Sequence, residues 1–375
     1  MEFSSIAPSD VAARCGRLRS AFPLNLQGLL VTNLANIRWL TGFTGSNGWL
    51  LVTPNVMALV TDGRYGDQAT EEIQHAGVDA DVLVGSTRSL MVEQLADALQ
   101  REHVDRLGFE GAHMTFAEHE LLSAALAVTL SGTSGIVEAL RRTKDHGEID
   151  RMERASDIAD AALAQTLQML TSEPTESQFR DELEFAMRRN GADGPSFDTI
   201  VAAGVNASLP HHHPDSTRIT EGMTVVIDFG ALFDGYHSDM TRTFVLGDPT
   251  ELQAEVYAVV LAAQQAGVDA VAPLARGREL DQLCRTSITD AGWGAWFNHG
   301  TGHGVGLQIH EAPWLTQGYD DTLAAMDVVT VEPGVYRRDF GGVRIEDMVV
   351  VTTNGCRPLT KTPKDSPCLP SPPTT

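Results

Sequence analysis

The sequence predicts an α/β N-terminal domain followed by an α+β domain that contains an internal duplication. Residues 1–140 alternate short apolar runs with helical patterns, which is typical of an α/β fold. Residues 141–361 contain two similar segments in which an apolar strand ends in a carboxylate. The chain has 375 residues, more than one hydrophobic core usually organises, and 42 % of them are hydrophobic. We therefore expect two cores, one in each domain.

The strands expected in the N-terminal domain are short and mostly apolar. They span residues 28–32, 49–53, 57–61, 79–84 and 106–109. Thr53-Pro54-Asn55 predicts a turn that joins the second and third strands as a hairpin. The last two strands are each followed by a helical pattern, as in α/β domains.

A charged stretch, residues 141–154, marks the expected domain boundary and begins a long helix. A capping box formed by Thr175 and Gln178 predicts the start of a second helix, and Gly191 ends it. Two more helices precede the second carboxylate segment. The apolar stripes of these helices predict the core residues Phe179, Leu183, Ala186, Met187, Leu252, Val256, Val259, Val260, Leu280, Leu283, Cys284 and Ile288. Residues 362–375 contain five prolines and are expected to form a disordered Pro-rich tail.

The composition argues against several classes of partner. The formal net charge is −23, and such a surface repels the phosphates of nucleic acids and of anionic membranes. No apolar stretch approaches the roughly 18 residues that a membrane span requires. The first ten residues lack the features of a signal peptide, and the four cysteines include no CxxC pair. We expect a cytoplasmic protein that binds neither nucleic acid nor membranes.

The internal duplication is visible in residues 223–230 and 326–334. Each segment is an apolar strand that ends in a carboxylate and a glycine, and each is followed by a second strand that carries another acid. The carboxylates are Asp228 and Asp239 in the first copy and Glu332 and Glu346 in the second. Helices before each copy complete a duplicated α+β half.

The first copy is predicted to be a hairpin with a two-residue turn at Asp234-Gly235. This turn would place Asp228 opposite Thr241, and Asp239 would then share the face of Asp228. A carboxylate in an apolar strand is costly unless it is paired or binds a metal. The alternative is a structural aspartate that is bonded to the backbone or to an arginine.

The second copy also contains carboxylates next to apolar strand residues. Glu332 follows the apolar run Val328–Val331, and Glu346 follows Ile345. Arg344 shares the strand face of Glu346, so an Arg344–Glu346 pair that stabilises the sheet is the alternative to a metal site here.

Histidines occur between glycines in the run from His299 to His310, which also contains His303. The glycines argue against a regular helix, so this run is not the helical HExxH zinc site. Glycines would let the backbone approach a metal and a substrate closely. A glycine-rich loop with incidental histidines is the alternative.

A second histidine group, His211 to His213, lies between Pro210 and Pro214 in a segment expected to be an extended loop. His211 is the candidate for function, whereas His212 and His213 are expected to be solvated.

Four acids and one histidine form an oxygen-rich ligand set. Divalent ions such as Mn²⁺, Co²⁺ or Zn²⁺ suit this set, and two ions are needed to neutralise four carboxylates. Two ions about 3.5–4 Å apart can hold a bridging hydroxide and polarise a carbonyl group, which indicates amide hydrolysis. No GxSxG motif, P-loop or Cys–His signature competes with this interpretation.

In combination, these motifs resemble those of the M24 metallopeptidase family, of the Xaa-Pro aminopeptidase and Xaa-Pro dipeptidase (prolidase) type. The matching runs are Asp228-Phe-Gly, Gly235-Tyr-x-Ser-Asp239-x-Thr-Arg-Thr, His299-Gly-x-Gly-His303-Gly-x-Gly, Val331-Glu332-Pro-Gly and Arg344-x-Glu346-Asp. Residues 36–46 and 61–65 resemble the creatinase/prolidase N-terminal domain. The resemblance covers nearly the whole chain. It implies a creatinase/prolidase-like domain over 1–140 and a pita-bread catalytic domain with a pseudo-twofold duplication over 141–361.

The resemblance also implies roles for the site residues. The ligands of two divalent ions per subunit would be Asp228, Asp239, His303, Glu332 and Glu346, with Asp239 and Glu346 bridging the ions. Mn²⁺ is the expected metal, with Co²⁺ or Zn²⁺ as alternatives. Glu332 would also carry the proton from the bridging water to the leaving proline nitrogen. His211 and His310 would contact the scissile carbonyl or the tetrahedral intermediate, and His299 and Arg344 would line the substrate pocket.

The activity implied is that of a Xaa-Pro aminopeptidase, which hydrolyses the bond between an N-terminal residue and proline in proline-containing peptides. A Xaa-Pro dipeptidase shares these motifs and is the alternative, and the compact length favours the aminopeptidase. A non-catalytic pita-bread binding protein is a remote alternative, because all five ligand positions are filled. The resemblance further implies a homodimer or homotetramer. Trp39, His299 and Tyr236 are the candidates for the proline slot.

Overall fold

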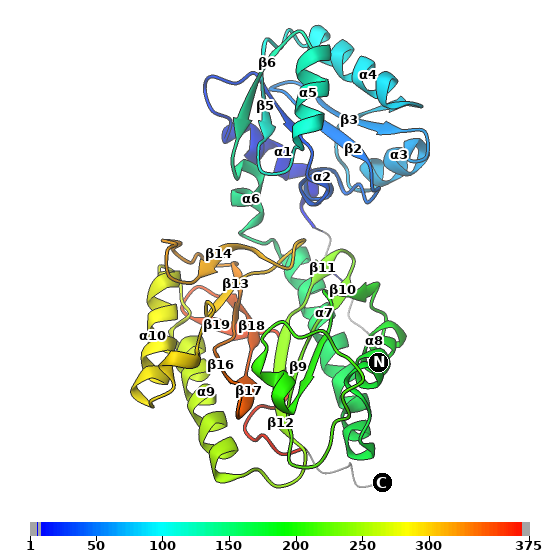
Figure 1. Cartoon of the computed structure of the whole chain (residues 1–375). Coiled ribbons are helices and arrows are strands. Elements are labelled where there is room, and N and C mark those ends of the chain that lie inside the picture. The colour runs from blue at the N-terminus through cyan, green and yellow to red at the C-terminus, as the bar shows by residue number, and fades with distance from the viewer. Residues whose placement is uncertain (1–5, 7–8, 370–375) are drawn as a thin grey trace. The chain divides into compact units, whose positions relative to one another are not determined.

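The computed structural model describes Ile6 and residues 9–369, and it divides into two compact units (Figure 1). The N-terminal unit spans Ser9–Arg141, and the C-terminal unit begins at Arg142. The sequence-based boundary, between residues 140 and 141, lies one residue before this division. Among the described residues, no helix is both long and apolar enough to cross a lipid bilayer.

The N-terminal unit is built on a six-stranded mixed sheet in the order β4-β3-β2-β1-β5-β6. Its strands are β1 (Gly28–Val31), β2 (Gly48–Val52), β3 (Met57–Asp62), β4 (Asp81–Gly85), β5 (Arg106–Glu110) and β6 (Thr129–Thr133). Its helices are α1 (Val11–Ser20), α2 (Leu34–Thr41), α3 (Gly66–His75), α4 (Arg88–Arg101), α5 (Phe116–Ala125) and α6 (Ile136–Arg141).

The five strands expected from the sequence are present in this unit, and the predicted turn joins β2 and β3, where Val52 pairs with Met57. Strand β6 was missed because Thr129–Thr133 carries mostly polar, partly exposed side chains on the edge of the sheet. Leu30, Leu51 and Leu107 of the sheet pack against Leu95 of α4 in the core.

The C-terminal unit contains two helix pairs and several small antiparallel sheets. Its α-helices are α7 (His146–Thr166), α8 (Glu176–Arg189), α9 (Glu251–Ala270) and α10 (Gly277–Asp290). Short 3₁₀ helices span Leu167–Ser172, Gly204–Ser208 and Gly294–Trp296. Its strands are β7 (Gly194–Pro195), β8 (Ile200–Ala203), β9 (Thr224–Phe229), β10 (Ala231–Phe233), β11 (Tyr236–His237), β12 (Met240–Val245), β13 (Gly302–Gly304), β14 (Glu311–Leu315), β15 (Val328–Val331), β16 (Gly334–Arg337), β17 (Gly341–Arg344), β18 (Asp347–Val351) and β19 (Cys356–Pro358).

Local sequence explains where the helices of this unit begin. Thr175 and Gln178 form the predicted capping box of α8, and each accepts a hydrogen bond from the backbone N–H of the other. The four predicted core residues of α8 are buried. The stripes predicted for α9 and α10 are partly wrong, because Leu252 is 37 % exposed and Leu283 is 41 % exposed. Both side chains lie at the edge of their helix's buried face.

Each half of the C-terminal unit contains a hairpin that changes sheets midway. In the first half, β9 pairs with β12, and the same two chain segments continue as the pair β10 and β11 beside β7. In the second half, β15 pairs with β18, and the segments continue as the pair β16 and β17. The predicted internal duplication is therefore present in the fold.

Strand alternation directs the carboxylates of these hairpins away from the helices. Val225 and Ile227 of β9 share a core with α7 and α8, and Val329 and Val331 of β15 share a core with α9 and α10. Asp228 and Glu332 have the opposite parity, so they face the inner side of their sheets. The helix pairs lie on the outer sides (Figure 1).

Backbone and side-chain hydrogen bonds join the two halves at this inner seam. The Glu346 backbone N–H donates to the Thr241 carbonyl oxygen at 3.1 Å. The Thr243 hydroxyl donates to the Arg344 carbonyl oxygen at 2.7 Å. Strand β12 of the first half is thereby held against the β17–β18 region of the second half.

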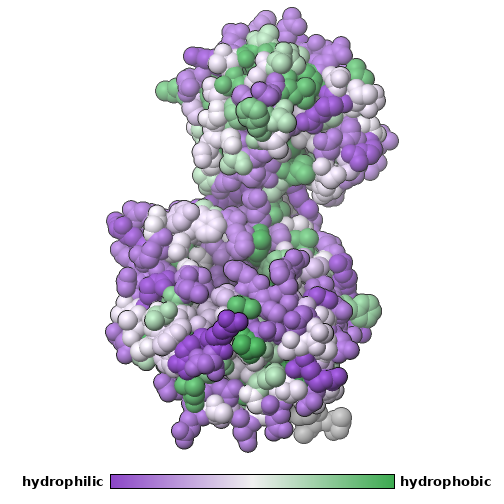
Figure 2. All heavy atoms as spheres, in the orientation of Figure 1, coloured by the Kyte–Doolittle hydropathy of each residue, from purple (hydrophilic) through white to green (hydrophobic). Residues whose placement is uncertain are grey.

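The C-terminal segment, residues 359–369, differs from the expected disordered tail. The Val245 N–H donates to the Pro367 carbonyl oxygen at 2.7 Å, and the Tyr257 hydroxyl donates to the Lys364 carbonyl oxygen at 2.9 Å. Proline content favours an extended chain, and in residues 359–369 that chain is bound to the surface of β12 and α9. Residues 370–375 of the predicted tail lie outside the described residues. Figure 2 shows that hydrophilic side chains dominate the visible face of the C-terminal unit, consistent with the high net charge.

Candidate active site

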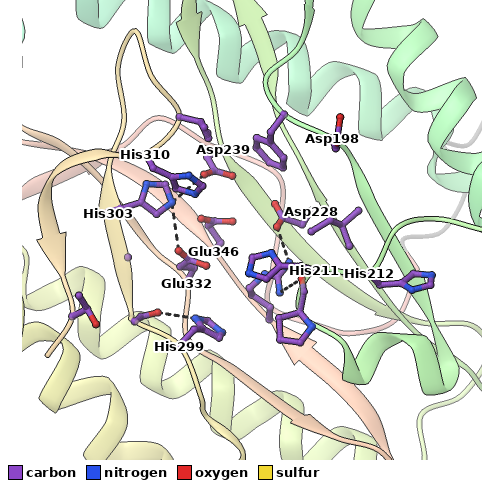
Figure 3. A pocket seen from close by; sticks show the side chains of 18 of the residues that line it. Asp198, His211, His212, Asp228, Asp239, His299, His303, His310, Glu332 and Glu346 are labelled. Atoms are coloured by element: carbon purple, nitrogen blue, oxygen red, sulfur yellow. Dashed lines mark hydrogen bonds and ion pairs between the residues drawn. The ribbon is translucent and has the colours of Figure 1, made fainter. Parts of the chain in front are cut away.

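A cavity of about 460 Å³ opens on the inner face of the C-terminal unit. The residues expected to act as metal ligands, catalytic groups or substrate-binding groups all line this cavity: Asp228, Asp239, His303, Glu332, Glu346, His211, His310, His299 and Arg344. Figure 3 shows Asp239, Glu346, Glu332 and His303 pointing toward one another, with Asp228 and His211 beside them. The four carboxylates thus lie in one cluster, which is the arrangement that the metal hypothesis requires.

The first hairpin has the predicted register. Asp228 pairs with Thr241 in β9 and β12, and the turn at Asp234-Gly235 has positive φ at both residues, 46° and 74°. Such a turn matches the twist of the two strands, as the Asp-Gly sequence predicts. Asp239 consequently lies on the same face as Asp228, as expected from the sequence.

The second hairpin brings Glu332 and Glu346 together at the point where it changes sheets. Val331 pairs with Asp347 and Gly334 pairs with Arg344, so the two glutamates lie opposite each other between these pairs. The Thr241 hydroxyl of the first hairpin donates to Glu346 Oε2 at 2.7 Å. Glu346 is therefore oriented by a residue from the other half of the duplication.

Arg344 bonds across the halves. Its NH2 group donates to Asp228 Oδ2 at 2.6 Å, and its Nε donates to the Thr241 hydroxyl at 3.0 Å. Arg344 is 3 % exposed. The ion pair that Arg344 forms among the described residues is with Asp228 of the other hairpin, in place of the Arg344–Glu346 pair that was the alternative.

His303 comes from β13, between two glycines that the packing requires. A Cβ atom on Gly302 would lie 2.1 Å from the Thr330 carbonyl oxygen, and one on Gly304 would lie 2.3 Å from the Ala312 carbonyl oxygen. His303 Nε2 lies 3.5 Å from Asp239 Oδ2 and 3.5 Å from Glu332 Oε1. The glycines of this run therefore bring the backbone close to neighbouring strands and set His303 among the carboxylates.

Burial and mutual repulsion raise the pKa values of the clustered acids. Burial, together with the charges of Glu346, Asp228 and Glu332, raises the pKa of Asp239 well above its ordinary value. Burial and neighbouring carboxylates raise the pKa of Glu346 in the same way, and burial raises the pKa of Glu332. Burial and the neighbouring His310 lower the pKa of His303 to about 4. A neutral imidazole and several crowded carboxylates form a set of ligand atoms with excess negative charge.

This set fits divalent cations. Ligand atoms of Asp239, His303 and Glu346 lie within 4.8 Å of one another. Asp228 uses Oδ2 for Arg344, while its Oδ1 is buried with no hydrogen-bond partner in the described structure. A buried carboxylate oxygen without a donor is costly, and a cation would satisfy it. Oxygen-rich sites with one imidazole suit Mn²⁺, Co²⁺ or Zn²⁺.

The three histidines 211–213 have different environments. His211 and His213 are exposed and line the cavity. His212 Nε2 lies 2.7 Å from Glu176 Oε2, and Glu176 is fully buried at the start of α8. The expectation that His212 is solvated is therefore wrong. The sequence did not reveal this pair, because Glu176 belongs to a distant helix.

His310 and His299 lie on different parts of the cavity wall. The ring of His310 packs edge-on against His303, with 4.4 Å between ring centroids. His299 Nε2 lies 2.9 Å from the Tyr336 hydroxyl, which also accepts a hydrogen bond from Arg344 at 2.8 Å. Burial and the Arg344 charge lower the pKa of His299 to about 4. No motif pointed to Tyr336, because its contacts form only in the folded chain.

The apolar part of the cavity wall was also missed by sequence reasoning. It includes Phe197, Ile200, Ile309 and Trp314. Of the three candidates for the proline slot, His299 lines the cavity, Tyr236 is buried with its hydroxyl bonded to Glu148, and Trp39 is buried in the core of the N-terminal unit. Lone aromatic and aliphatic residues carry no sequence signal that separates a pocket from a core.

Comparisons with known proteins agree with these observations. The pattern of metallopeptidase family M24 matches residues 150–353, and that of the creatinase/prolidase N-terminal domain matches residues 16–143. An uncharacterized peptidase of Bacillus subtilis is 40 % identical over 351 residues, which cover 93 % of this chain and 98 % of that protein.

Two solved structures illustrate the range of related activities. A Xaa-Pro dipeptidase from Bacillus anthracis is 39 % identical, covers 96 % of this chain and all of its own, and superposes with a TM-score of 0.92. A Thermotoga maritima X-Pro aminopeptidase is 32 % identical, with coverages of 92 % and 96 % and a TM-score of 0.83. With its creatinase/prolidase N-terminal domain and its pita-bread catalytic domain, the chain belongs to metallopeptidase family M24 and is a peptide hydrolase.

Proposed function

We propose that this protein is a dinuclear-metal Xaa-Pro aminopeptidase that releases the N-terminal residue of peptides whose second residue is proline. Asp228, Asp239, His303, Glu332 and Glu346 would hold the two divalent ions. When bound, two such ions supply a water of lowered pKa and polarise the scissile carbonyl group. Mn²⁺ is the proposed metal.

The chain's own residues have distinct tasks in this proposal. The leaving nitrogen of proline must receive a proton, and Glu332, which lines the cavity and whose pKa is raised by burial, would hold that proton. His211 and His310 line the cavity beside the carboxylate cluster and would donate hydrogen bonds to the oxygen that gains negative charge. His299 and Arg344 would orient the substrate.

The preference for a proline substrate follows from the bond itself. A Xaa-Pro bond is a tertiary amide without an N–H group, so a site that recognises it needs an apolar surface for the ring instead of a hydrogen-bond acceptor. The apolar wall of Phe197, Ile200, Ile309 and Trp314 supplies such a surface.

The choice of aminopeptidase over dipeptidase rests on the scarcity of positively charged side chains in the cavity wall. Among the described lining residues, Arg344 is the one arginine and there is no lysine. Arg344 is buried and bonded to Asp228. The carboxylate of a Xaa-Pro dipeptide lies on the proline itself, where desolvation is costly without a cation. A longer peptide carries a neutral amide at that point, so this cavity favours Xaa-Pro-Yaa substrates.

One activity panel tests the proposal. Metal-stripped protein would be reconstituted with Mn²⁺, Co²⁺ or Zn²⁺ and incubated with Ala-Pro, Ala-Pro-Ala, Ala-Ala-Ala and acetyl-Ala-Pro-Ala. We expect kcat/KM for Ala-Pro-Ala to exceed that for Ala-Pro by about tenfold or more, as expected when a charged group is left unpaired. Ala-Ala-Ala and the acetylated peptide should be poor substrates.

The same panel separates the alternatives. Faster cleavage of Ala-Pro than of Ala-Pro-Ala would identify a Xaa-Pro dipeptidase. Binding of the metal without cleavage of any peptide would identify a non-catalytic protein. Light scattering would test the homodimer or homotetramer implied by the family resemblance.

A further inference from the structure

One lysine of the C-terminal segment, Lys364, contacts the residue that follows the proposed metal ligand Glu346. Lys364 Nζ donates to Asp347, the residue that follows Glu346, and to Gln264 Oε1 at 2.6 Å. The side chains of Lys364 and Asp347 are 18 % and 4 % exposed. This contact is unexpected from composition, because the segment carries the prolines that predicted disorder.

Asp347 is the centre of a buried polar network. Besides Lys364, its donors are Arg242 NH2 at 2.8 Å, the Thr360 hydroxyl at 2.9 Å and Gln264 Nε2 at 3.0 Å. Two of these four donors, Lys364 and Thr360, belong to the C-terminal segment. A buried carboxylate needs such partners, so loss of one of them changes how the others are held.

Arg242 connects this network to the backbone of the carboxylate cluster. Its NH1 group donates to the backbone carbonyl oxygens of Glu346 and Thr241. Thr241 in turn donates from its hydroxyl to Glu346 Oε2. Lys364 and Asp347 therefore hold Arg242 on the outer side of the strand whose inner side presents Glu346.

We propose that Lys364 is a positioning residue for the metal centre and that it orients Glu346 through Asp347 and Arg242. The inference rests on the proposed function, because it concerns the same ligand set. Outer partners of metal ligands typically change metal affinity or activity by about 10–100-fold when removed. The C-terminal segment is thus part of the site's support.

Lys361 provides a matched control in the same segment. It pairs with Asp157 at 2.6 Å, but both side chains are largely exposed, at 53 % and 41 %. An exposed pair of this kind contributes little. Lys361→Met therefore removes the same charge from the same segment without touching the network of Asp347.

The experiment measures Mn²⁺ binding to metal-stripped protein by calorimetry, together with kcat and KM for Ala-Pro-Ala. Lys364→Met should weaken Mn²⁺ binding by about 10–100-fold and lower kcat with KM unchanged. Thr360→Val, which removes one hydrogen-bond donor to Asp347 and keeps the side-chain volume, should weaken binding by several fold. Lys361→Met should match wild type in both measurements. Lys364→Arg, which keeps a cationic donor, should recover part of the lost affinity.

Each outcome is decisive. Equal Mn²⁺ affinity in Lys364→Met, Lys361→Met and wild type would overturn the inference, as would a change in KM alone. Should Lys364→Met fail to fold, as judged by circular dichroism of the metal-free protein, the Mn²⁺ affinity of Thr360→Val decides alone. Failure of the proposed function looks different, because wild type itself would then cleave no Xaa-Pro peptide or would cleave Ala-Pro faster than Ala-Pro-Ala.

Discussion

Asp239 illustrates at the residue scale how burial and charge conflict in this site. It is 4 % exposed and lies beside three other carboxylates, whose charges and whose shared burial raise its pKa well above its ordinary value. In the absence of metal, each ionised neighbour destabilises the folded state. In the presence of divalent cations, the same crowding becomes favourable, because every carboxylate then faces positive charge.

Substitution of Asp239 should consequently have opposite effects with and without metal. At about pH 8, Asp239→Asn should stabilise the metal-free protein by about 1–4 kcal/mol, because it removes an acid whose pKa burial and like charges raise, and such an acid destabilises the folded state above its unfolded pKa. With Mn²⁺ present, the variant should melt below wild type and show no turnover. Thermal unfolding of both proteins with and without Mn²⁺ measures the stabilisation in one condition and the destabilisation in the other. The exposed Asp248→Asn should stay within about 0.5 kcal/mol of wild type in both conditions. Unchanged activity in Asp239→Asn would contradict its assignment as a ligand.

At the element scale, strand β13 depends on close contacts between backbones. A Cβ atom on Gly302 would overlap the Thr330 carbonyl oxygen, and Thr330 lies on β15, the strand that leads to Glu332. The Thr330 hydroxyl accepts a hydrogen bond from the His303 N–H at 3.1 Å. The spacing of β13 and β15 therefore sets the distance between a histidine and a glutamate of the site.

Gly302→Ala should force these strands apart. We expect a loss of about 1–3 kcal/mol in the free energy of unfolding, as for other overpacked sites, and a fall in kcat of about 100-fold from displacement of His303. Urea denaturation and steady-state kinetics measure the two effects. Gly355→Ala is the matched control, because a Cβ atom there meets nothing within 4 Å. If both variants behaved alike, the close approach of β13 would not matter.

At the scale of the whole molecule, contacts between residues more than 100 positions apart hold the C-terminal segment in place. The C-terminal segment packs on α9, where the Tyr257 hydroxyl donates to the carbonyl oxygens of Lys364 and Ser366. Tyr257 is 3 % exposed, and burial raises its pKa to about 12. The folded state therefore favours the neutral phenol.

This shift predicts the sign of the alkaline pH dependence. The unfolded phenol ionises near pH 10, so the stabilisation is fully present below that pH and is lost as the pH rises toward 12. The loss should amount to about 1–3 kcal/mol. Urea unfolding at several pH values between 9 and 11 should show a steeper decline for wild type than for Tyr257→Phe. Tyr319→Phe, at a residue that is 51 % exposed, should decline like wild type. Equal slopes in all three proteins would contradict the prediction.

The sequence by itself determined the features that local rules control. Residues close in the chain set the turn at Asp234-Gly235, the register of Asp228 with Thr241 and the capping box of α8, so these were predictable. The repeated strand–carboxylate pattern likewise indicated the duplicated fold and the carboxylates that lie in the cavity.

Tertiary structure alone decided how these parts meet. Arg344 bonds Asp228, which is 116 residues away, and Lys364 of the proline-rich segment bonds Asp347. Composition alone predicts that the proline-rich segment is solvated, and strand parity alone predicts that Arg344 pairs with Glu346. Both predictions differ from the structure because neither rule includes contacts between distant segments. Those contacts form only when burial removes competing water, so the partner of each charge depends on which groups the folded chain encloses together.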